Sequence, residues 1–448
     1  MLLRIWSSHF RAVLALLSVC ALQSGLAAKD PTEDLRYWVY EVTPLTDNGL
    51  QQLRELHTEL DFLSYPQLDQ TCRVLIYDFQ YEMIQLIQGE KFGLWKIHNV
   101  TDEVNKQIAQ QRAKLNKQPR FKRGITSLSQ FAAGDYRDYD EISDWLDELG
   151  NRYFTFAHTM SIGVTGERRQ IKLIKIGRPK TSFLGSNREK PAIWIDGGIH
   201  AREWVSPSSV LYVIAKLVGD YSDDHDVQRF VNEIDWYILP VMNPDGYQFT
   251  HTDQRLWRKN RATRAYSDRY NRMCHGVDLN RNYDFHFGRV DTSRDPCASN
   301  YGGERKESEL ETRAVANFLR QRRDEVKVYI SLHTYGPYWF VPYGHARGSK
   351  HPNTDEMKPI ARDAANAAGR VNGNYYQVGS AASLLYPASG TSDDWAASLG
   401  IPWSFGLEVG NQTYGFDPPR SWIRSSGEEV WQGVKQVARR LLTSRHRH

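Results

Sequence analysis

The stretch that decides the fold is Ala192–Trp204, which reads AIWIDGGIHAREW. Its first four residues are apolar and mostly β-favouring, so they predict a buried strand. Gly197 and Gly198 follow closely, and glycine permits the sharp backbone turn that ends such a strand. His200 and Glu203 lie just beyond the turn, where open α/β sheets place ligand-binding groups. The stretch therefore predicts one strand of an α/β sheet with functional side chains at its carboxyl end.

Similar apolar runs recur along the chain, and segments with helical character lie between several of them. Alternating strands and helices are typical of a sheet that helices cover on both faces. From residue 124 onward we therefore expect an α/β fold with a mixed central sheet flanked by helices. The expected strands are 170–176, 192–195, 236–239 and 326–332, and the expected helices are 139–149, 209–217 and 308–321.

The N-terminal residues 1–28 have the composition of an export signal. Arg4 and Arg11 supply positive charge, residues 12–22 are mostly apolar and uncharged, and Ala27 is small enough for signal peptidase. The apolar stretch is too short to span a bilayer comfortably, although an uncleaved membrane anchor is the alternative. We expect a secreted, extracellular protein with no membrane partner.

Residues 29–123 are predicted to form a separate, small α+β unit. Strand-favouring runs lie at 37–42, 74–77 and 95–97, and leucines recur at helical spacing within 50–60. The pattern of longer, more buried strands starts only after this region. The sequence therefore predicts two folded units behind the export signal.

Charge and cysteine content narrow the class of protein. The chain has 57 Lys and Arg against 53 Asp and Glu, and a net charge of only +4 gives no reason to expect a nucleic-acid partner. Cys274 and Cys297 lie a short loop apart, which suits one disulfide in an oxidising compartment. Cys20 leaves with the export signal, so Cys72 is the odd cysteine, and its state is left open.

Two strand ends carry residues that could hold a metal ion. His200 and Glu203 follow the strand at 192–195, and His333 follows the strand at 326–332. Imidazole nitrogen and carboxylate oxygen are suitable zinc ligands, and a catalytic zinc needs three protein ligands and an open position. A His-x-x-Glu pair alone is common on protein surfaces, so the spacing by itself does not decide between a metal site and a chance arrangement.

Six ordered motifs make the chain resemble the zinc metallocarboxypeptidases of the pancreatic A/B type, from about Gly124 to the C-terminus. The motifs are DGGIHAREW at 196–204, RLWRKNR at 255–261, GVDLNRN at 276–282, SLHTY at 331–335, YPASGTSDDW at 386–395 and FGLE at 405–408. The resemblance implies hydrolysis of the C-terminal peptide bond of peptides and proteins, with one Zn²⁺ per chain held by His200, Glu203 and His333. The resemblance, rather than the spacing, carries this assignment.

The same resemblance implies a role for residues around the zinc. Glu408 matches the carboxylate that takes a proton from the attacking water. Arg258 matches the residue that stabilises the negative oxygen formed as water attacks the carbonyl. Asp278 matches a group that orients the ligand His200. Together these positions imply a hydrolytic centre rather than a structural metal site.

Other matching positions imply recognition of a free chain end. Arg281, helped by Asn280, matches the pair that grips the terminal carboxylate, and a guanidinium can bond both carboxylate oxygens at once. Tyr386 matches a mobile tyrosine that closes over the bound end, and Arg202 matches a residue on the substrate's approach path. These positions imply an exopeptidase.

Asp393 is the position that bears most on specificity. It matches the floor of the pocket for the terminal side chain, where a buried carboxylate selects Lys or Arg. Ala381 matches a pocket wall and is small enough to leave room for a long side chain. Two alternatives stay open, namely that Asp394 points inward instead, or that Asp393 pairs with a cation of the protein. We expect B-type specificity for basic ends, and A-type specificity for apolar or aromatic ends is the alternative.

The N-terminal unit resembles the family's propeptide, an α+β open sandwich, in size, position and strand–helix order, with a looser residue match. It ends in segment 117–123, which carries four positive charges in seven residues and contains Pro119. We interpret this segment as the site where an activating protease cuts near Arg123, although a plain solvated linker is the alternative. Residues 29–123 would then be the activation propeptide and residues 124–448 the catalytic domain, which we expect to be a monomer.

Some details leave alternatives open. Residues 409–416 depart from the family pattern, which puts contacts behind Glu408 in doubt but not the base itself. Arg255, Lys259 and Arg261 fit a solvated positive rim as well as a direct role.

Rival classes fit the sequence less well. A non-catalytic relative that only binds peptides would have lost a zinc ligand or the base, and all of them are present. The sequence contains neither the Gly-x-Ser-x-Gly of serine hydrolases nor the His-Glu-x-x-His of zinc endopeptidases. Asn99 and Asn411 each begin a glycosylation sequon, and their use is left open.

Overall fold

The structure is a computed structural model. It describes residues 37–56, 60–63, 66–77, 92–99, 127–179, 190–262, 264, 266–267, 273–410 and 415–444. The predicted export signal, the predicted cleavage site at Arg123 and the sequon at Asn411 lie outside the described residues.

The larger unit is built around an eight-stranded sheet with the strand order β13-β12-β14-β11-β7-β8-β6-β5. The central strands β14, β11, β7 and β8 are parallel, while β6 pairs antiparallel with β8 and β5, and β12 with β14. The predicted mixed sheet is therefore confirmed. The strands are β5 (Ala157–Val164), β6 (Gln170–Ile176), β7 (Ala192–Asp196), β8 (Asp235–Leu239), β11 (Val326–Thr334), β12 (Tyr338–Phe340), β13 (Gln377–Gly379) and β14 (Trp403–Val409).

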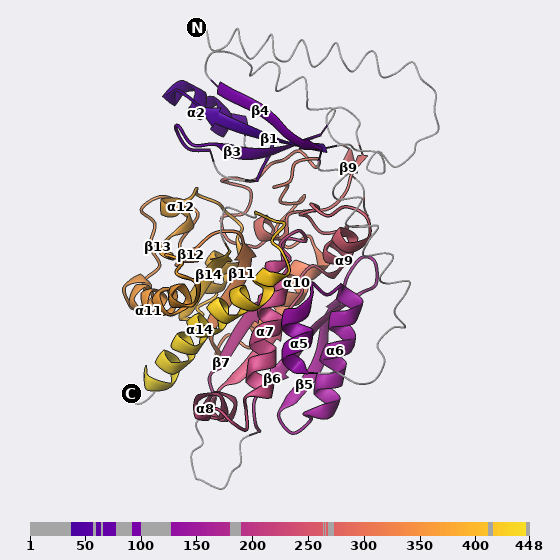
Figure 1. Cartoon of the computed structure of the whole chain (residues 1–448), viewed down its shortest axis with the longest axis vertical. Coiled ribbons are helices and arrows are strands. Elements are labelled where there is room, and N and C mark those ends of the chain that lie inside the picture. The colour runs from indigo at the N-terminus through magenta and orange to yellow at the C-terminus, as the bar shows by residue number, and fades with distance from the viewer. Residues whose placement is uncertain are drawn as a thin grey trace.

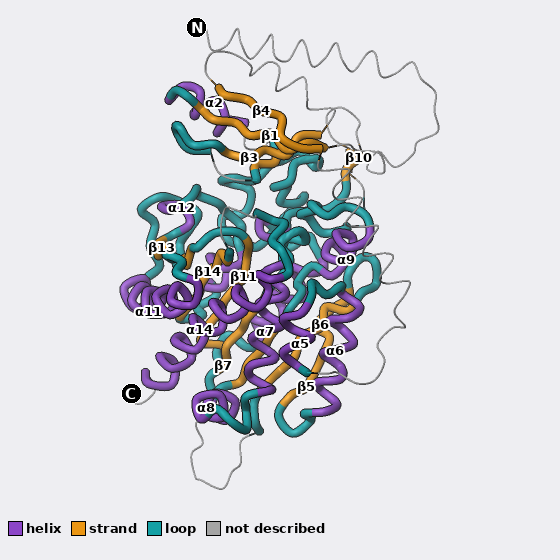
Figure 2. The backbone as a smooth tube through the Cα atoms, viewed as in Figure 1, coloured by secondary structure: helices purple, strands orange, loops and turns teal. Residues whose placement is uncertain are grey.

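Helices cover both faces of this sheet (Figures 1 and 2). Along β7, Ile193 and Ile195 belong to one buried cluster, and Ala192 and Trp194 belong to the other. Because successive strand residues point to opposite faces, an all-apolar strand needs cover on both sides. The helices are α5 (Leu128–Gly134), α6 (Tyr139–Arg152), α7 (Val205–Gly219), α8 (His225–Glu233), α9 (Pro244–Thr252), α10 (Leu310–Gln321), α11 (Thr354–Asn372), α12 (Ala381–Leu384), α13 (Ser392–Ser398) and α14 (Ser421–Ser444).

Two helices show how the local sequence sets these elements. Helix α6 begins with a capping box in which Asp138 accepts from the backbone of Glu141, and Glu141 accepts in return from the backbone of Asp138. Helix α7 has no such cap, and nearly all its side chains are buried, so packing rather than capping stabilises it. It starts directly after Trp204 and thereby fixes the loop that carries His200 and Glu203.

The N-terminal unit is a four-stranded antiparallel sheet in the order β2-β3-β1-β4, with one described helix. Its elements are β1 (Tyr37–Pro44), α2 (Asp47–Glu55), β2 (Asp61–Phe62), β3 (Cys72–Tyr77) and β4 (Phe92–Asn99). Tyr40, Leu53 and Val74 form its small core together with Cys72, which is buried and unbonded to another cysteine. The unit lies at one end of the larger one (Figure 1).

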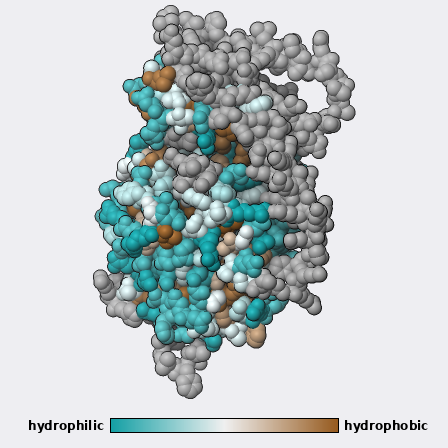
Figure 3. Space-filling model, viewed as in Figure 1, coloured by the Kyte–Doolittle hydropathy of each residue, from teal (hydrophilic) through white to brown (hydrophobic). Residues whose placement is uncertain are grey.

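The surface is mainly hydrophilic on the face drawn in Figure 3, where hydrophobic residues are scattered over the larger unit. Within the described residues, no helix combines the length and the apolar character needed to cross a membrane.

Candidate active site

The predicted metal ligands and the predicted base lie close together because the strands that carry or precede them are neighbours. His200 and Glu203 follow β7, His333 lies near the end of β11, and Glu408 lies near the end of β14. Strands β7, β11 and β14 are adjacent and parallel, and His333 stands directly opposite Glu408 in the register. Parallel strands end at the same edge of a sheet, so residues from three distant segments of the sequence come together there.

His200, Glu203 and His333 form a compact group of ligand atoms. His200 Nδ1 lies 2.6 Å from Glu203 Oε1, and His333 Nδ1 lies 3.2 Å from both His200 Nδ1 and Glu203 Oε2. All three side chains are buried, and no other group of three such residues meets the same distances in the described part of the chain. Two imidazoles and one carboxylate in this arrangement are a donor set that suits Zn²⁺.

The hydrogen bond behind His200 fits the same interpretation. His200 Nε2 lies 3.2 Å from Asp278 Oδ1, a carboxylate that can only accept when ionised. The proton of the imidazole is therefore assigned to Nε2, and Nδ1 turns an unprotonated lone pair toward His333 and Glu203. Two ring nitrogens and a carboxylate converge here within the distances that one metal ion can bridge, so the residues fit a zinc ion.

Arg258 lies beside this group. Its Nε and Nη2 donate to Asp278 Oδ2 at 3.1 Å and 2.8 Å, and its Nη1 is 3.9 Å from Glu203. Asp278 thus holds both His200 and Arg258, which fixes the guanidinium relative to the ligand group. Arg258 also lines the cavity above, so its remaining N–H groups can reach a bound molecule.

Glu408 completes the edge of the sheet. Its Oε2 is buried and has no hydrogen-bond partner among the described residues. Burial raises the pKa of Glu408 to about 8, which Glu203 reinforces, while the positive charges of His333 and Arg258 act in the opposite direction. A buried carboxylate with free acceptor capacity next to a ligand group is suited to accept a proton.

A cavity of about 320 Å³ joins these groups to the residues expected to recognise a substrate. All predicted catalytic and substrate-binding positions line it, whereas Asp278 lies behind them. The positions that line it are His200, Arg202, Glu203, Arg258, Asn280, Arg281, His333, Tyr386, Asp393 and Glu408, together with Ala381.

Arg281 is held by a neighbour that the sequence analysis did not identify. Its Nε donates to the backbone oxygen of Asp291 at 2.8 Å, and its Nη2 donates to Asp291 Oδ2 at 2.5 Å. Its Nη1 donates to the backbone oxygen of Asn280 at 2.9 Å, and Asn280 Oδ1 accepts from the backbone of Ser392. The fold brings Asp291 to Arg281 from ten residues along the chain, and no motif marks it.

The two adjacent aspartates have different surroundings. Asp394 accepts backbone N–H groups of Gly344 and His345 at 2.8–3.0 Å and does not line the cavity, whereas Asp393 does. Burial, followed by the charge of Asp394, raises the pKa of Asp393 to about 6. Gly406 makes room for it, because a Cβ at that position would lie 3.2 Å from Asp393 Oδ2.

The N-terminal unit roofs the cavity. Asp61 of β2 forms two hydrogen bonds, of 2.6 Å and 3.1 Å, with the guanidinium of Arg202, and Tyr335 donates to the backbone oxygen of Leu63. Arg202 also stacks over the ring of Phe416 at 4.3 Å. The N-terminal residues that line the cavity are Glu41, Phe62, Leu63, Gln67, Gln70, Thr71 and Arg73.

The interpretation of Arg255, Lys259 and Arg261 as a solvated rim is wrong for the first two. Arg255 is 2% exposed and stacks over Trp204 at 3.7 Å, and Lys259 is 6% exposed and donates to a backbone oxygen. Arg261 is half-buried over the ring of Phe249 at 3.9 Å. Aromatic rings and backbone carbonyls accept these cations, so the segment packs against the protein instead of extending into water.

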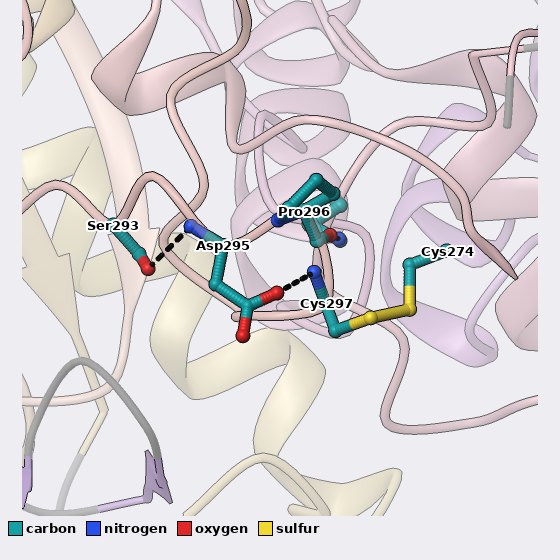
Figure 4. The surroundings of a disulfide bond; sticks show 6 residues. Cys274, Ser293, Asp295, Pro296 and Cys297 are labelled. Carbon is teal, nitrogen blue, oxygen red and sulfur yellow. Dashed lines mark hydrogen bonds between the residues drawn. A yellow bond between two sulfur atoms is a disulfide. The ribbon is translucent and has the colours of Figure 1, made fainter. Parts of the chain in front are cut away.

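The predicted disulfide is present between Cys274 and Cys297 (Figure 4). Beside it, Asp295 accepts from the backbone of Cys297 at 2.9 Å, and Ser293 accepts from the backbone of Asp295 at 3.0 Å. The covalent loop and its tight turn carry the substrate-facing segment around Arg281.

The comparison with protein families decides the identity. The family model described as zinc carboxypeptidase matches residues 142–433. The chain belongs to the zinc carboxypeptidase family. It is therefore a metallocarboxypeptidase, a hydrolase, and the resemblance predicted from six motifs is confirmed.

Individual relatives agree with this membership. Carboxypeptidase A2 of Mus musculus is 33% identical over 405 residues, which is 89% of this chain and 92% of the relative. Carboxypeptidase B of Astacus astacus is 38% identical over 306 residues, which is 68% of this chain and 96% of the relative. Because the carboxypeptidase relatives include both A and B types, they leave the preferred end residue undecided.

Solved structures agree on the fold. The crystal structure of thrombin activatable fibrinolysis inhibitor has a TM-score of 0.76 at 29% identity and covers 91% of this chain and 99% of its own. The crystal structure of carboxypeptidase A from Helicoverpa armigera has a TM-score of 0.77 at 27% identity and covers 92% of this chain and 98% of its own.

Proposed function

We propose that this zinc carboxypeptidase is a secreted zymogen that, once activated, releases C-terminal Lys or Arg from peptides and proteins. One Zn²⁺ per chain is held by His200, Glu203 and His333. The observation that carries the specificity is the carboxylate of Asp393 at the cavity, next to the gap left by Gly406.

The chemistry follows from the residues at the sheet edge. When bound, Zn²⁺ supplies Lewis-acid polarisation of the scissile carbonyl and lowers the pKa of water. Glu408 takes the proton from the attacking water and passes it to the leaving amine, for which its unpaired, buried oxygen suits it. Arg258, oriented by Asp278, donates to the carbonyl oxygen as that oxygen gains negative charge.

Cleavage is confined to chain ends by the opposite side of the cavity. Arg281 bonds the terminal carboxylate of the substrate, with Asn280 beside it. Tyr386 also lines the cavity and closes over the bound end. An internal peptide bond has no carboxylate to offer here, so it leaves the buried guanidinium without its ligand.

Specificity for basic ends follows from charge. A neutral side chain would bury Asp393 without a partner, whereas an ammonium or guanidinium would pair with it. Burial and the neighbouring charge of Asp394 raise the pKa of Asp393, so a cation brought by the substrate would favour its charged form. Asp394 is already engaged by two backbone amides, so it does not compete for the substrate.

The N-terminal unit supports the zymogen part of the proposal. Residues 29–123 act as a propeptide that covers the cavity, and cleavage near Arg123 releases the catalytic domain 124–448 as a monomer. The buried pair of Asp61 and Arg202 contributes to holding the cover, because one partner withdrawn alone would leave a buried charge.

The test is a matched set of peptides that differ only in a C-terminal Arg, Lys or Phe. The chain is activated by a protease that cleaves after basic residues, and the released amino acids are measured by mass spectrometry. We expect single residues to be released, with Arg and Lys preferred. A preference for Phe would replace the B-type proposal with the A-type alternative, and cleavage within the peptides would contradict the exopeptidase proposal.

A further inference from the structure

The guanidinium of Arg281 is largely committed before any substrate binds. Arginine has five N–H groups, and three of those of Arg281 donate to acceptors among the described residues. Two go to Asp291, one to its backbone oxygen and one to its carboxylate, and the third goes to the backbone oxygen of Asn280. The side chain is 4% exposed and lines the cavity, so the N–H groups that have no acceptor among the described residues can bond a molecule that enters it.

The two bonds to Asp291 occupy one particular edge of the guanidinium. Nε–H and the near N–H of Nη2 point the same way and form the side-on edge of the planar fork. Asp291 takes both of them at 2.8 Å and 2.5 Å. The end-on edge, between Nη1 and Nη2, is the other face on which a carboxylate can accept two parallel bonds.

Asp291 itself has a backbone conformation that most residue types seldom adopt. Its φ is +49°, in the left-handed region that non-glycine residues seldom adopt, although Asp tolerates it better than most. Its Oδ1 accepts from Asn300 Nδ2 at 3.2 Å, so both carboxylate oxygens have a partner. A strained backbone that places a buried carboxylate against a substrate-binding arginine is a candidate for a functional constraint.

We propose that Asp291 is a positioning residue of the terminal-carboxylate site. It fixes the side-on edge of Arg281, so that the end-on edge faces the cavity as a preorganised, two-pronged donor for the carboxylate of the substrate. This inference rests on the proposed function, in which Arg281 grips the chain end. It adds that the orientation of the grip, and not only its positive charge, depends on a specific neighbour.

Two variants separate this role from a general loss of structure. Asp291→Gly removes the carboxylate and keeps the backbone oxygen, and glycine adopts φ of +49° without strain, so the backbone of this segment is retained. Asp291→Asn keeps an oxygen acceptor for Nη2. Its new N–H₂ can donate to Asn300 if that amide flips, because Asn300 Oδ1 has no partner among the described residues.

The measurement compares two product-like inhibitors of the activated, zinc-loaded enzyme. These are the free amino acid with the preferred side chain and its carboxamide, which differ only in the group that Arg281 would bind. Inhibition constants are determined against one reference peptide. We expect the wild type to prefer the free acid, Asp291→Gly to reduce this preference about tenfold, and Asp291→Asn to restore most of it.

The possible outcomes are distinct. An unchanged or increased preference in Asp291→Gly would overturn the inference, since Asp291 would then be neutral or would compete with the substrate. If the wild-type enzyme hydrolyses the peptide but binds acid and amide equally, Arg281 does not bind the terminal carboxylate. The inference about Asp291 would then be overturned as well. A chain that releases no terminal residue at all would refute the proposed function itself.

Discussion

The cavity has two walls that are built in different ways. The metal wall, formed by His200, Glu203, His333 and Glu408, comes from the ends of three adjacent parallel strands. The recognition wall, formed by Arg281, Tyr386 and Asp393, comes from loops and short helical turns. Strand ends and the turn after β7 place the first group, whereas contacts between loops, such as that of Asp291 with Arg281, place members of the second.

This difference suggests that the metal wall carries out the chemical step and that the recognition wall selects the substrate. The parallel register holds the metal wall as one unit, so its members act together and a loss at any of them affects the chemical step. The recognition wall is assembled from contacts between loops and short helices, so changes there should alter which substrates bind before they alter the rate of chemistry. Variants on the two walls therefore test whether the division is real.

Removal of the metal is the change with the largest expected effect. Treatment of the activated enzyme with a zinc chelator should reduce hydrolysis of an Arg-ended peptide to background, because all chemistry proposed for the metal wall depends on Zn²⁺. Addition of Zn²⁺ should restore it, and bound zinc is quantified in parallel by atomic absorption. Full activity in demonstrably zinc-free enzyme would refute the proposed mechanism.

The next largest effect is expected from Glu408→Gln. This change keeps the shape of the side chain and removes its ability to take a proton, so kcat should fall by about 10³-fold. Zinc content should stay at one ion per chain, since Glu408 is not one of the three converging ligands. Loss of zinc from this variant would instead show that Glu408 is a metal ligand, which would contradict its assignment as the base.

On the recognition wall, Asp393→Asn should change selection rather than chemistry. The ratio of kcat/KM for Arg-ended over Phe-ended peptides should fall by about 100-fold, because the amide no longer pairs with a cation. The shape of the pocket is retained, which makes this variant a control for volume. If kcat/KM falls equally for both peptides, Asp393 has a structural role and does not select the terminal side chain. That result would contradict the division between the two walls.

The smallest effect on activity is expected behind the metal wall, at Glu311. Burial raises the pKa of this carboxyl to about 7 in the fold, above its ordinary value of 4.5, although Asn260 donates to it at 3.0 Å. A raised folded-state pKa gives a contribution to stability that is present below about pH 4.5 and is lost as the pH rises through 7.

Glu311→Gln should remove that pH dependence. Chemical unfolding at pH 5 and pH 8 should show the variant gaining roughly 1–3 kcal/mol relative to the wild type at the higher pH. Peptide hydrolysis at neutral pH should stay within about twofold. A relative loss of stability with rising pH would contradict the assigned direction of the pKa shift.

The metal wall could be predicted from sequence for a physical reason. Buried parallel strands are visible as apolar runs, and their carboxyl ends meet at one edge, so His200 and His333 could be brought together without coordinates. Glu203 followed from its place three residues after His200. The motifs then supplied what geometry alone could not, namely that the group is a catalytic centre of a known family.

The recognition wall could be predicted only in part. Asp393 and Asp394 are adjacent and chemically identical, and their directions depend on which backbone amides a distant loop offers. Asp291 carries no motif, and its left-handed backbone conformation cannot be inferred from the sequence around it. The sequence leaves the place of Arg255 open because charge favours exposure, whereas its partners are a tryptophan ring and backbone oxygens.

The disulfide has a consequence for how the protein must be made. The loop that Cys274 and Cys297 close, 23 residues apart in sequence, contains Arg281 and Asp291, whereas the three proposed zinc ligands lie outside it. A disulfide that closes a loop of this length stabilises the folded state by about 3 kcal/mol, because it restricts the unfolded chain. Production in a reducing cytosol would therefore give a less stable chain, in which no covalent bond closes the segment that carries Arg281 and Asp291. Metal content alone would not report whether this bond has formed, because the three proposed zinc ligands lie outside the loop.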